Sequence, residues 1–290
     1  MSDPPCNGLS IDVEEYFHAL NLRPAFPRAA WPGLPRRAEA GVERCLEILD
    51  RAGRKATFFV LGWIAEFEPQ IVRTIQKEGH EIGSHGDSHD PAHELGQGGF
   101  EKDVRRSLEL LARLDIRPRG FRASTFSVTR STFWALQTLA DLGIDYDSSI
   151  FPVRHDRYGI SDFSRVPTLV MLNGRSLAEL PLLTLRRLGI NLPAAGGGYL
   201  RQFPLSLTRR ALKEMNEEGH PGVLYVHPWE LDPEQPRAPS GTIGWLSAVR
   251  HYRNLDQTAD RLRRLLDEFE FGPLQPIADR ARASHGQSQT

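Results

Sequence analysis

Three histidines lie in the eleven-residue stretch HEIGSHGDSHD, which runs from His80 to Asp90. His85 and His89 are four residues apart and follow a short apolar run. On a turn of helix, side chains with this spacing lie on one face, with Cβ atoms about 5–6 Å apart. Two imidazoles placed in this way can bind one divalent metal ion. The alternative is a pair of surface histidines in a polar turn.

A pair of acids in SIDVEEYF could complete such a metal site. Alternation along a strand points Asp12 and Glu14 to the same side, so one carboxylate can bind metal while the other stays free as a base. Glu15 is expected to be solvated, and solvated acids at a strand end are the alternative for all three. A site built from nitrogen and oxygen ligands suits Zn²⁺ or another first-row metal. Three protein ligands would leave a position for water.

Two more polar residues end apolar or extended stretches. His227 ends GVLYVH, and a histidine with its pKa near neutrality can act as a general acid. A buried histidine bonded to a backbone carbonyl is the alternative. Arg122 ends RGFR and could hold a catalytic carboxylate ionised through a bidentate pair. That interpretation overlaps with a structural salt bridge across strand ends.

The elements that must position these residues follow an alternating pattern. Apolar runs predict strands over residues 8–13, 56–62, 80–84, 119–123, 143–149, 178–183 and 222–227. Amphipathic stretches predict helices over residues 39–52, 71–78, 101–114, 131–142, 206–218 and 256–269. This alternation indicates parallel strands with crossover helices, whose carboxyl ends share one face and build sites there. Two segments, 151–176 and 193–204, are predicted to be irregular or Gly-rich loops.

Composition limits the class of protein. The 290 residues are 40% hydrophobic and 25% charged, with a net charge of −1, which is ordinary for a globular protein and gives no reason to expect nucleic acid as a partner. Cys6 and Cys45 are the two cysteines, which argues against a disulfide scaffold or a thiolate zinc site. No apolar leader or membrane-length run is visible. We therefore expect a cytoplasmic protein with one α/β domain over residues 7–280 and a disordered tail over 281–290.

Taken together, the motifs resemble the polysaccharide deacetylases, also called the NodB-homology domain or carbohydrate esterase family 4, over roughly residues 7–279. The resemblance implies a distorted (β/α) barrel with a metal-dependent N-deacetylase site, and Zn²⁺ as the favoured metal. SIDVE resembles the first motif, which makes Asp12 the catalytic base and Glu14 a metal ligand. SHGDSH resembles the second motif, which makes His85 and His89 metal ligands.

The remaining motifs supply the other roles that the resemblance implies. FRASTF resembles the third motif, whose arginine, here Arg122, orients the base. YVHP resembles the last motif, whose histidine, here His227, is the general acid. A backbone N–H near Phe126 would help to hold the oxyanion. Tyr199 and Trp229 are candidates for stacking on sugar rings, with core packing as the alternative.

The chain also departs from the family pattern. The second acid of the first motif is displaced by one residue and is Glu14, and Ser124 replaces the usual proline of the third motif. YDSSIFP takes the place of the fourth motif, which leaves its acid open between Asp145 and Asp147. Segments such as GGGYLRQFP and HPWELDPEQPR resemble a subfamily found in exosortase (PEP-CTERM) exopolysaccharide loci.

The function expected from this resemblance is removal of acetyl groups from N-acetylhexosamine units of an exopolysaccharide or its lipid-linked precursor. A ureide or cyclic-amide hydrolase, or a peptidoglycan hydrolase, could use the same site. A non-catalytic saccharide-binding component is the alternative from another class, although it would not need both a free base and a separate acid. A membrane-associated exopolysaccharide assembly machinery is compatible with this function as a partner.

Overall fold

The structure is a computed structural model that describes residues 5–287. The strands are β1 (Asn7–Val13), β2 (Thr57–Val60), β3 (Glu81–Ser84), β4 (Gly120–Phe121), β5 (Tyr146–Asp147), β6 (Thr168–Leu172), β7 (Arg175–Glu179), β8 (Thr184–Arg187), β9 (Ile190–Pro193), β10 (Val223–Val226) and β11 (Phe271–Gly272). The α-helices are α1 (Ala38–Arg51), α2 (Gly62–Phe67), α3 (Pro69–Lys77), α4 (Ala92–Ala112), α5 (Trp134–Asp141), α6 (Gly198–Gln202), α7 (Leu205–Glu217), α8 (Trp245–Tyr252), α9 (Leu255–Glu268) and α10 (Gln275–Gln287).

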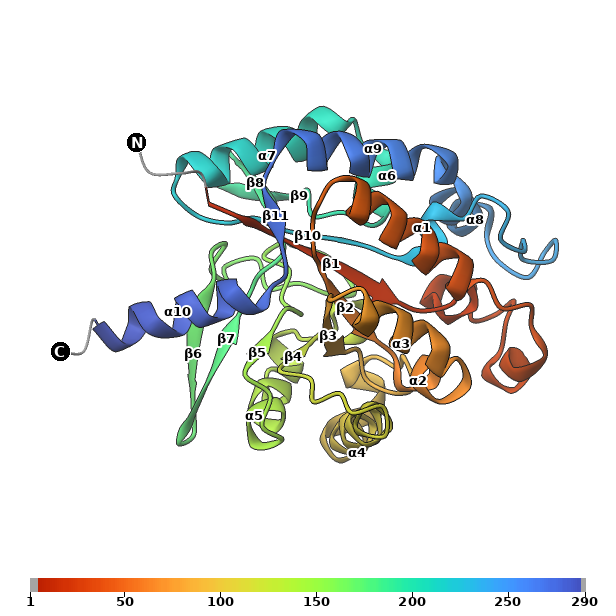
Figure 1. Cartoon of the computed structure of the whole chain (residues 1–290), viewed down its shortest axis with the longest axis horizontal. Helices are drawn as coiled ribbons and strands as arrows, with labels where there is room; N and C mark the ends of the chain where they lie inside the picture. Colours follow the sequence, from red (N-terminus) through yellow and green to blue (C-terminus); the bar gives the residue numbers. More distant parts are fainter. Residues whose placement is uncertain (1–4, 288–290) are drawn as a thin grey trace.

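The main sheet has the strand order β10-β1-β2-β3-β4-β5-β7-β6, and β11 also pairs with β1. Neighbours from β10 to β7 are parallel, whereas β6 is antiparallel to β7. Helices α1, α3, α4 and α5 lie outside the strands, and α7 and α9 run above β10 and β11 (Figure 1). This arrangement confirms the predicted single-domain α/β fold of the distorted (β/α)-barrel type.

The sequences of the central strands are largely apolar because both faces of these strands are buried. Every residue of β1, β2 and β10 is buried, because helices or core side chains cover both faces of the sheet. Helix α1 contributes the apolar face that its sequence predicts, with Val42, Cys45 and Leu49 all buried. Its first residue lies within one position of the predicted start of this helix.

The barrel is distorted because irregular chain, rather than a strand of the main sheet, lies along the free side of β10. The Leu183 amide donates to the Val223 carbonyl at 3.0 Å, and the Tyr225 amide donates to the Ala195 carbonyl at 2.9 Å. Gly196 approaches β10 so closely that a Cβ atom there would lie 1.9 Å from the Tyr225 oxygen. The Gly-rich segment is therefore pressed against the sheet edge and leads directly into α6.

The structure contains two hairpins that the sequence analysis did not predict: the first spans a segment predicted to be irregular and the start of a predicted strand, and the second lies almost entirely in residues to which no element was assigned. Strands β6 and β7 pair around Asn173 and Gly174, and β8 and β9 form a separate pair around Leu188 and Gly189. Asn-Gly between alternating apolar residues is a strong hairpin signal, so the first hairpin could have been predicted. The second has a left-handed Leu188 (φ 48°), a residue that is not typical of turns.

Helix α10 continues through Gln287, whereas disorder was expected from residue 281. Ala281 packs against the core, and Arg282 binds the carboxylate of Asp145 at 3.1 Å. These contacts give the segment partners that its polar composition did not indicate. Residues 288–290 lie outside the described residues. In the range 5–287, no helix combines the length and the apolar character needed to cross a membrane.

Candidate active site

The carboxyl ends of the parallel strands surround a cavity of about 460 Å³. Asp12 and Glu14 reach it from the end of β1, and His85 follows β3. His89 lies on the same loop as His85, and His227 follows β10. The structure therefore brings these five residues together at one end of the sheet.

His85 and His89 are brought together by a loop and not by a turn of helix. Residues 85–90 have no helical structure, and His89 has a left-handed backbone (φ 59°). The two ring centroids are nevertheless 5.2 Å apart. The helical turn predicted from the four-residue spacing is therefore wrong. The two rings nevertheless lie close together, as that spacing predicted.

The hydrogen bonds of both histidines fix which ring nitrogen is free. His85 Nδ1 lies 2.7 Å from the Arg122 carbonyl, and His89 Nδ1 lies 2.9 Å from the His18 carbonyl. A carbonyl oxygen can only accept a hydrogen bond, so each Nδ1 carries a proton. In the neutral ring, each Nε2 therefore has a free lone pair that can bind a metal ion. Burial lowers the pKa of His85 to about 4, which keeps that ring neutral. Metal-binding histidines are commonly oriented in this way.

Glu14 supplies the third candidate ligand. Its Oε2 lies 2.7 Å from His89 Nε2, yet that oxygen is buried and has no hydrogen-bond donor among the described residues. Two acceptor atoms at this separation need a cation or a proton between them. Ligand atoms of Glu14, His85 and His89 all lie within 4.8 Å of one another. The donor set, the buried acceptor and the fixed tautomers fit a divalent metal ion.

Trp229 holds the other oxygen of this carboxylate. Its indole N–H donates to Glu14 Oε1 at 2.7 Å, and its ring stacks on His227 and on His251 at centroid distances of 4.8 and 4.4 Å. Only 7% of Trp229 is exposed. The structure therefore gives Trp229 a role in orienting Glu14, which differs from the predicted stacking on a sugar ring.

Arg122 is fully buried and reaches the candidate base. Its Nη1 donates to Asp12 Oδ1 at 2.8 Å, while Nε and Nη2 donate to the carbonyl and hydroxyl of Ser148, each at 2.8 Å. The contact with Asp12 is made through one nitrogen, whereas a bidentate pair was expected. The other donors of the guanidinium anchor it to the segment after β5, so Arg122 fixes the position of the Asp12 carboxylate.

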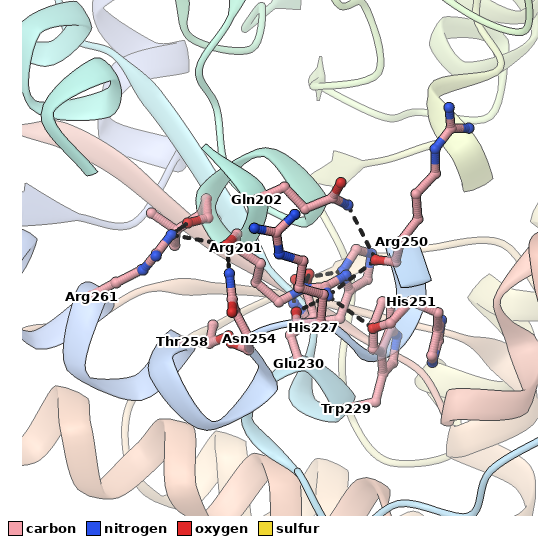
Figure 2. Close-up of polar contacts among 12 residues, drawn as sticks. Arg201, Gln202, His227, Trp229, Glu230, Arg250, His251, Asn254, Thr258 and Arg261 are labelled. Atoms are coloured by element: carbon pink, nitrogen blue, oxygen red, sulfur yellow. Dashed lines mark hydrogen bonds and ion pairs between the residues drawn. The ribbon is translucent and has the colours of Figure 1, made fainter. Parts of the chain in front are cut away.

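His227 lies across the cavity from Asp12 and is held from behind by two residues that the sequence analysis did not single out. Its Nε2 is 3.6 Å from Glu14 Oε1 and 4.0 Å from Asp12 Oδ2. Its Nδ1 is 2.9 Å from Glu230 Oε2, and Arg201 Nε donates to Glu230 Oε1 at 2.6 Å. Figure 2 shows this chain of Arg201, Glu230 and His227 beneath helix α6.

The charges along this chain raise the proton affinity of His227. Burial alone lowers the pKa of His227, but the carboxylates of Glu230, Glu14 and Asp12 raise it to about 9. For Glu230, burial is opposed by Arg201 and His227, and the pKa of this carboxyl falls to about 2. A protonated imidazole facing the cavity can donate a proton to a leaving group.

The backbone donor expected near Phe126 is displaced by one residue. The Phe126 amide already donates to the Ala123 carbonyl at 3.2 Å. Thr125 also lines the cavity, and its amide has no acceptor within the described part of the chain. Its left-handed backbone (φ 56°) belongs to a tight turn after β4. Thr125 is therefore a better candidate than Phe126 for donating to an oxyanion.

The structure places the remaining candidate residues as follows. Tyr199 lines the cavity, and its hydroxyl lies 2.6 Å from that of Tyr158, so the predicted sugar contact at Tyr199 stays a prediction. Asp145 is bound by Arg119 and Arg282 away from the cavity. Asp147 is fully buried and forms a hydrogen-bonded carboxyl pair with Glu179.

Asp145 and Asp147 are both absent from the cavity lining. Ser124, in place of the usual proline, is buried, and its Oγ has no partner among the described residues. Glu15 was expected to be solvated, but it is buried and accepts from the amides of Arg37 and Ala38 at 2.7 and 2.9 Å. It therefore caps the start of α1.

Comparison with known proteins agrees with this geometry. Residues 33–146 match the family model described as polysaccharide deacetylase. Within that stretch, the chain is similar to the polysaccharide deacetylases. Residues 148–279 match a second model, described as a domain of unknown function, DUF3473. The resemblance to the exosortase (PEP-CTERM) subfamily stays a prediction.

Individual relatives match over short stretches. A 71-residue stretch is 38% identical to a peptidoglycan-N-acetylglucosamine deacetylase of Bacillus cereus and covers 24% of this chain and 26% of that protein. An 81-residue stretch is 31% identical to the uncharacterized protein YlxY of Bacillus subtilis and covers 28% of this chain and 25% of that protein. The chain thus spans about a quarter of the length of the curated relatives it matches.

Solved structures resemble the whole fold. A Mycobacterium smegmatis protein provisionally described as a polysaccharide deacetylase is 22% identical, with a TM-score of 0.65 and coverage of 98% of this chain and 92% of that chain. Puue allantoinase is 15% identical, with a TM-score of 0.60 and coverage of 98% and 95%. At these identities the likeness concerns the fold alone. The strands of both matched regions belong to one sheet, and the two solved structures share this fold over nearly the whole chain.

Proposed function

We propose that this protein is a metal-dependent N-deacetylase that removes acetyl groups from N-acetylhexosamine units of a polysaccharide. The observation that carries the proposal is the cluster of Glu14, His85 and His89, with Asp12 and His227 on its borders. Such a hydrolase acts on a linear amide bond. An exopolysaccharide or its lipid-linked precursor is the proposed substrate, and Zn²⁺ is the proposed metal.

The residues divide the reaction between them. A divalent ion held by Glu14, His85 and His89 would supply Lewis-acid chemistry to the amide carbonyl and to water. Asp12, held in place by Arg122, takes the proton of the attacking water. The Thr125 amide donates to the developing oxyanion. His227, which is kept protonated by Glu230, gives its proton to the leaving amine.

The shape of the cavity supports a saccharide chain as substrate. The cavity of about 460 Å³ shares Thr125, His155, Arg157 and Tyr158 with a second cavity of about 740 Å³. Two adjoining cavities of this size leave room for several sugar units, whereas a ureide or cyclic amide needs a single small pocket. Peptidoglycan contains the same N-acetyl linkage and is the second candidate polymer. The cytoplasmic location stays a prediction.

Acetate release tests the proposal directly. Purified protein should release acetate from tetra-N-acetylchitotetraose (hereafter acetylated chitotetraose) after loading with Zn²⁺, lose this activity after chelation, and regain it when metal is restored. A ureide substrate such as allantoin should not be turned over. Metal-loaded protein that releases no acetate from any N-acetylated saccharide, including peptidoglycan fragments, would leave a binding role as the better interpretation.

The assignment within the metal cluster has its own test. Asp12→Asn should abolish turnover and retain metal, whereas Glu14→Gln should lose metal. His85→Ala and His89→Ala should each lose metal while keeping most of the thermal stability, because the ligands lie on loops outside the core. Elemental analysis and thermal melts measure both properties. If Asp12→Asn loses metal and Glu14→Gln retains it, the two acids have the opposite roles.

A further inference from the structure

The mouth of the candidate active site carries positive charge that the deacetylation reaction does not use. Arg157, from the loop between β5 and β6, and Arg250, from α8, both line the cavity, and both are exposed. Within the described part of the chain, neither guanidinium has an ion pair or a hydrogen bond. Figure 2 shows the side chain of Arg250 extending away from the buried cluster around Glu230.

The acids of the cavity lie at its floor and are already engaged. Among the described lining residues, the acids are Asp12 and Glu14. Asp12 is bound by Arg122, and Glu14 is bound by Trp229 and faces His89. No lining carboxylate is therefore left to neutralise the mouth. A substrate in this cavity can contact two exposed guanidinium groups that have no ion-pair partner among the described residues.

The backbone that carries these arginines is held firmly. The Arg250 carbonyl accepts from Arg201 Nη1 at 3.2 Å and from Gln202 Nε2 at 3.1 Å, which ties α8 to α6. On the other side, the Tyr158 hydroxyl lies 2.6 Å from the Tyr199 hydroxyl, which ties the Arg157 loop to α6. Both anchors converge on one short helix, so the two arginines frame the same opening.

The cavity that adjoins the mouth carries charges of both signs. Arg154 lines the adjoining cavity and has no ion pair or hydrogen bond among the described residues. Of the acids along this cavity, Glu94 is bound by Arg23 at 2.7 Å. Asp156 lies 3.0 Å from His155, and burial lowers the pKa of that histidine, so Asp156 keeps its negative charge. The adjoining cavity therefore carries Arg154 and one exposed acid, and the excess of positive charge is greatest around Arg157 and Arg250.

We propose that Arg157 and Arg250 bind an anionic group, a carboxylate or a phosphate, on the saccharide next to the N-acetyl unit that is hydrolysed. The proposal rests on the proposed deacetylase function and names its substrate class, an acidic N-acetylated saccharide. A guanidinium binds either anion by donating two parallel N–H hydrogen bonds to its oxygens. A neutral sugar has no such pair of charged acceptor oxygens. A uronic acid residue and a sugar phosphate are the two sources of such a group.

Three N-acetylated saccharides separate the cases. Acetylated chitotetraose is neutral, a heparosan tetrasaccharide alternates N-acetylglucosamine with a uronic acid, and tetra-N-acetylchitotetraose 1-phosphate carries phosphate. The structure predicts a higher kcat/KM for at least one anionic saccharide than for acetylated chitotetraose at low salt. The preference should decrease in 0.5 M NaCl, because exposed charges are screened. The saccharide that shows the larger preference identifies the source of the anion.

Substitutions assign this preference to the two arginines. Arg157→Ala and Arg250→Ala should each reduce it about two- to fivefold, and the double variant about tenfold. Arg263→Ala is the matched control, because Arg263 is an exposed arginine of α9 outside the cavity lining and has no ion pair or hydrogen bond of its side chain among the described residues. The control should leave all three values unchanged. Metal content and melting temperature of each variant exclude loss through misfolding.

Binding measured by calorimetry keeps the two proposals distinguishable. If acetylated chitotetraose is deacetylated but neither anionic saccharide is preferred, the anion site is wrong and the deacetylase stands. If no saccharide is hydrolysed but an anionic one binds more tightly through Arg157 and Arg250, the anion site stands and the deacetylase is wrong. Equal binding of all three saccharides by the original protein and the double variant would overturn the anion site in every case.

Discussion

At the scale of single residues, Glu230 sets the charge on His227. The Glu230 carboxylate contacts both the ring Nδ1 and the backbone amide of His227, at 2.9 and 3.0 Å. Its charge is a main reason why the pKa of His227 is raised to about 9 despite burial. Glu230 does not reach the reacting atoms, so it is a positioning residue that acts through the general acid.

We expect Glu230→Gln to keep the orientation of the ring and to remove the charge. A general acid must be protonated, so activity falls as pH rises through its pKa. Without the carboxylate, the alkaline limb of the kcat/KM profile should move to lower pH, with a loss of about tenfold or more at pH 8. Metal content should not change. A profile that keeps its shape while the melting temperature falls would assign Glu230 a structural role only.

The contact of Glu230 with His227 could have been predicted from sequence, whereas its contact with Arg201 could not. Glu230 follows His227 by three residues, with Pro228 between them, and this spacing typifies a side chain that folds back onto the residue starting a helical turn. That signal could have been used. Arg201 is distant from Glu230 in sequence and lies in a Gly-rich segment. Only the contact of α6 with the strand end shows that the two residues form a pair.

A second residue-scale feature is the buried carboxyl pair of Asp147 and Glu179. Burial raises the pKa of both groups, and their contact adds to the effect at Glu179. The folded protein therefore holds a proton that the unfolded chain releases above about pH 4. Because the folded pKa values are raised, the stabilisation is complete below the unfolded values and is lost as pH rises.

The melting temperature should accordingly fall between about pH 5 and pH 8. Glu179→Gln keeps a hydrogen-bond donor for Asp147 and cannot ionise, so it should flatten this slope and raise the melting temperature at pH 8. Glu101→Gln is the control, because Glu101 forms an exposed pair with Arg105 at the surface. A slope that is the same in the original protein and in Glu179→Gln would show that the pair does not retain a proton.

At the scale of elements, apolar pattern was sufficient for the central strands and their crossover helices. Strands such as β1 and β2 are buried on both faces, so their sequences are apolar throughout and easy to recognise. The short strands that complete the barrel were harder. Strand β9 alternates exposed with half-buried residues, whereas β8 begins with two buried residues, and the turn between them contains the left-handed Leu188. Their pairing depends on contacts that local sequence does not specify.

Gly196 shows how strongly one of these connections depends on its residue. Its φ is 128°, and an added Cβ would lie 1.9 Å from the Tyr225 backbone oxygen. Gly196→Ala should therefore destabilise the protein by at least about 1–3 kcal/mol and reduce activity, because the same segment leads to Arg201. Gly79→Ala is the matched control: Gly79 also has a positive φ, of 72°, but no atom lies within 4 Å of its added Cβ.

Thermal melts of the two glycine variants measure this difference. The control should show only the backbone cost of a left-handed alanine, about 1 kcal/mol. If Gly196→Ala and Gly79→Ala melt at the same temperature, the close approach to β10 does not contribute beyond the backbone conformation.

At the scale of the whole molecule, the two matched regions form one sheet. The region 33–146 contributes β2 to β5, whereas β10 and β11 of the region 148–279 flank β1. The candidate metal ligands all precede residue 148, but Trp229, which holds Glu14, and His227 come after it. The second region therefore completes the site as well as the barrel.

This division predicts that a fragment of residues 1–147 does not form the metal site, although it contains Asp12, Glu14, His85 and His89. In the fragment, β1 loses two of its three neighbouring strands, and the buried side chains of Leu9 and Ile11 lose part of their cover. We expect no cooperative thermal transition and no stoichiometric Zn²⁺. The control is a chain of residues 5–287, which keeps every described contact and should melt in one transition and bind one metal ion. A fragment that melts cooperatively and binds one Zn²⁺ would show that the polysaccharide deacetylase region folds without the strands that follow it.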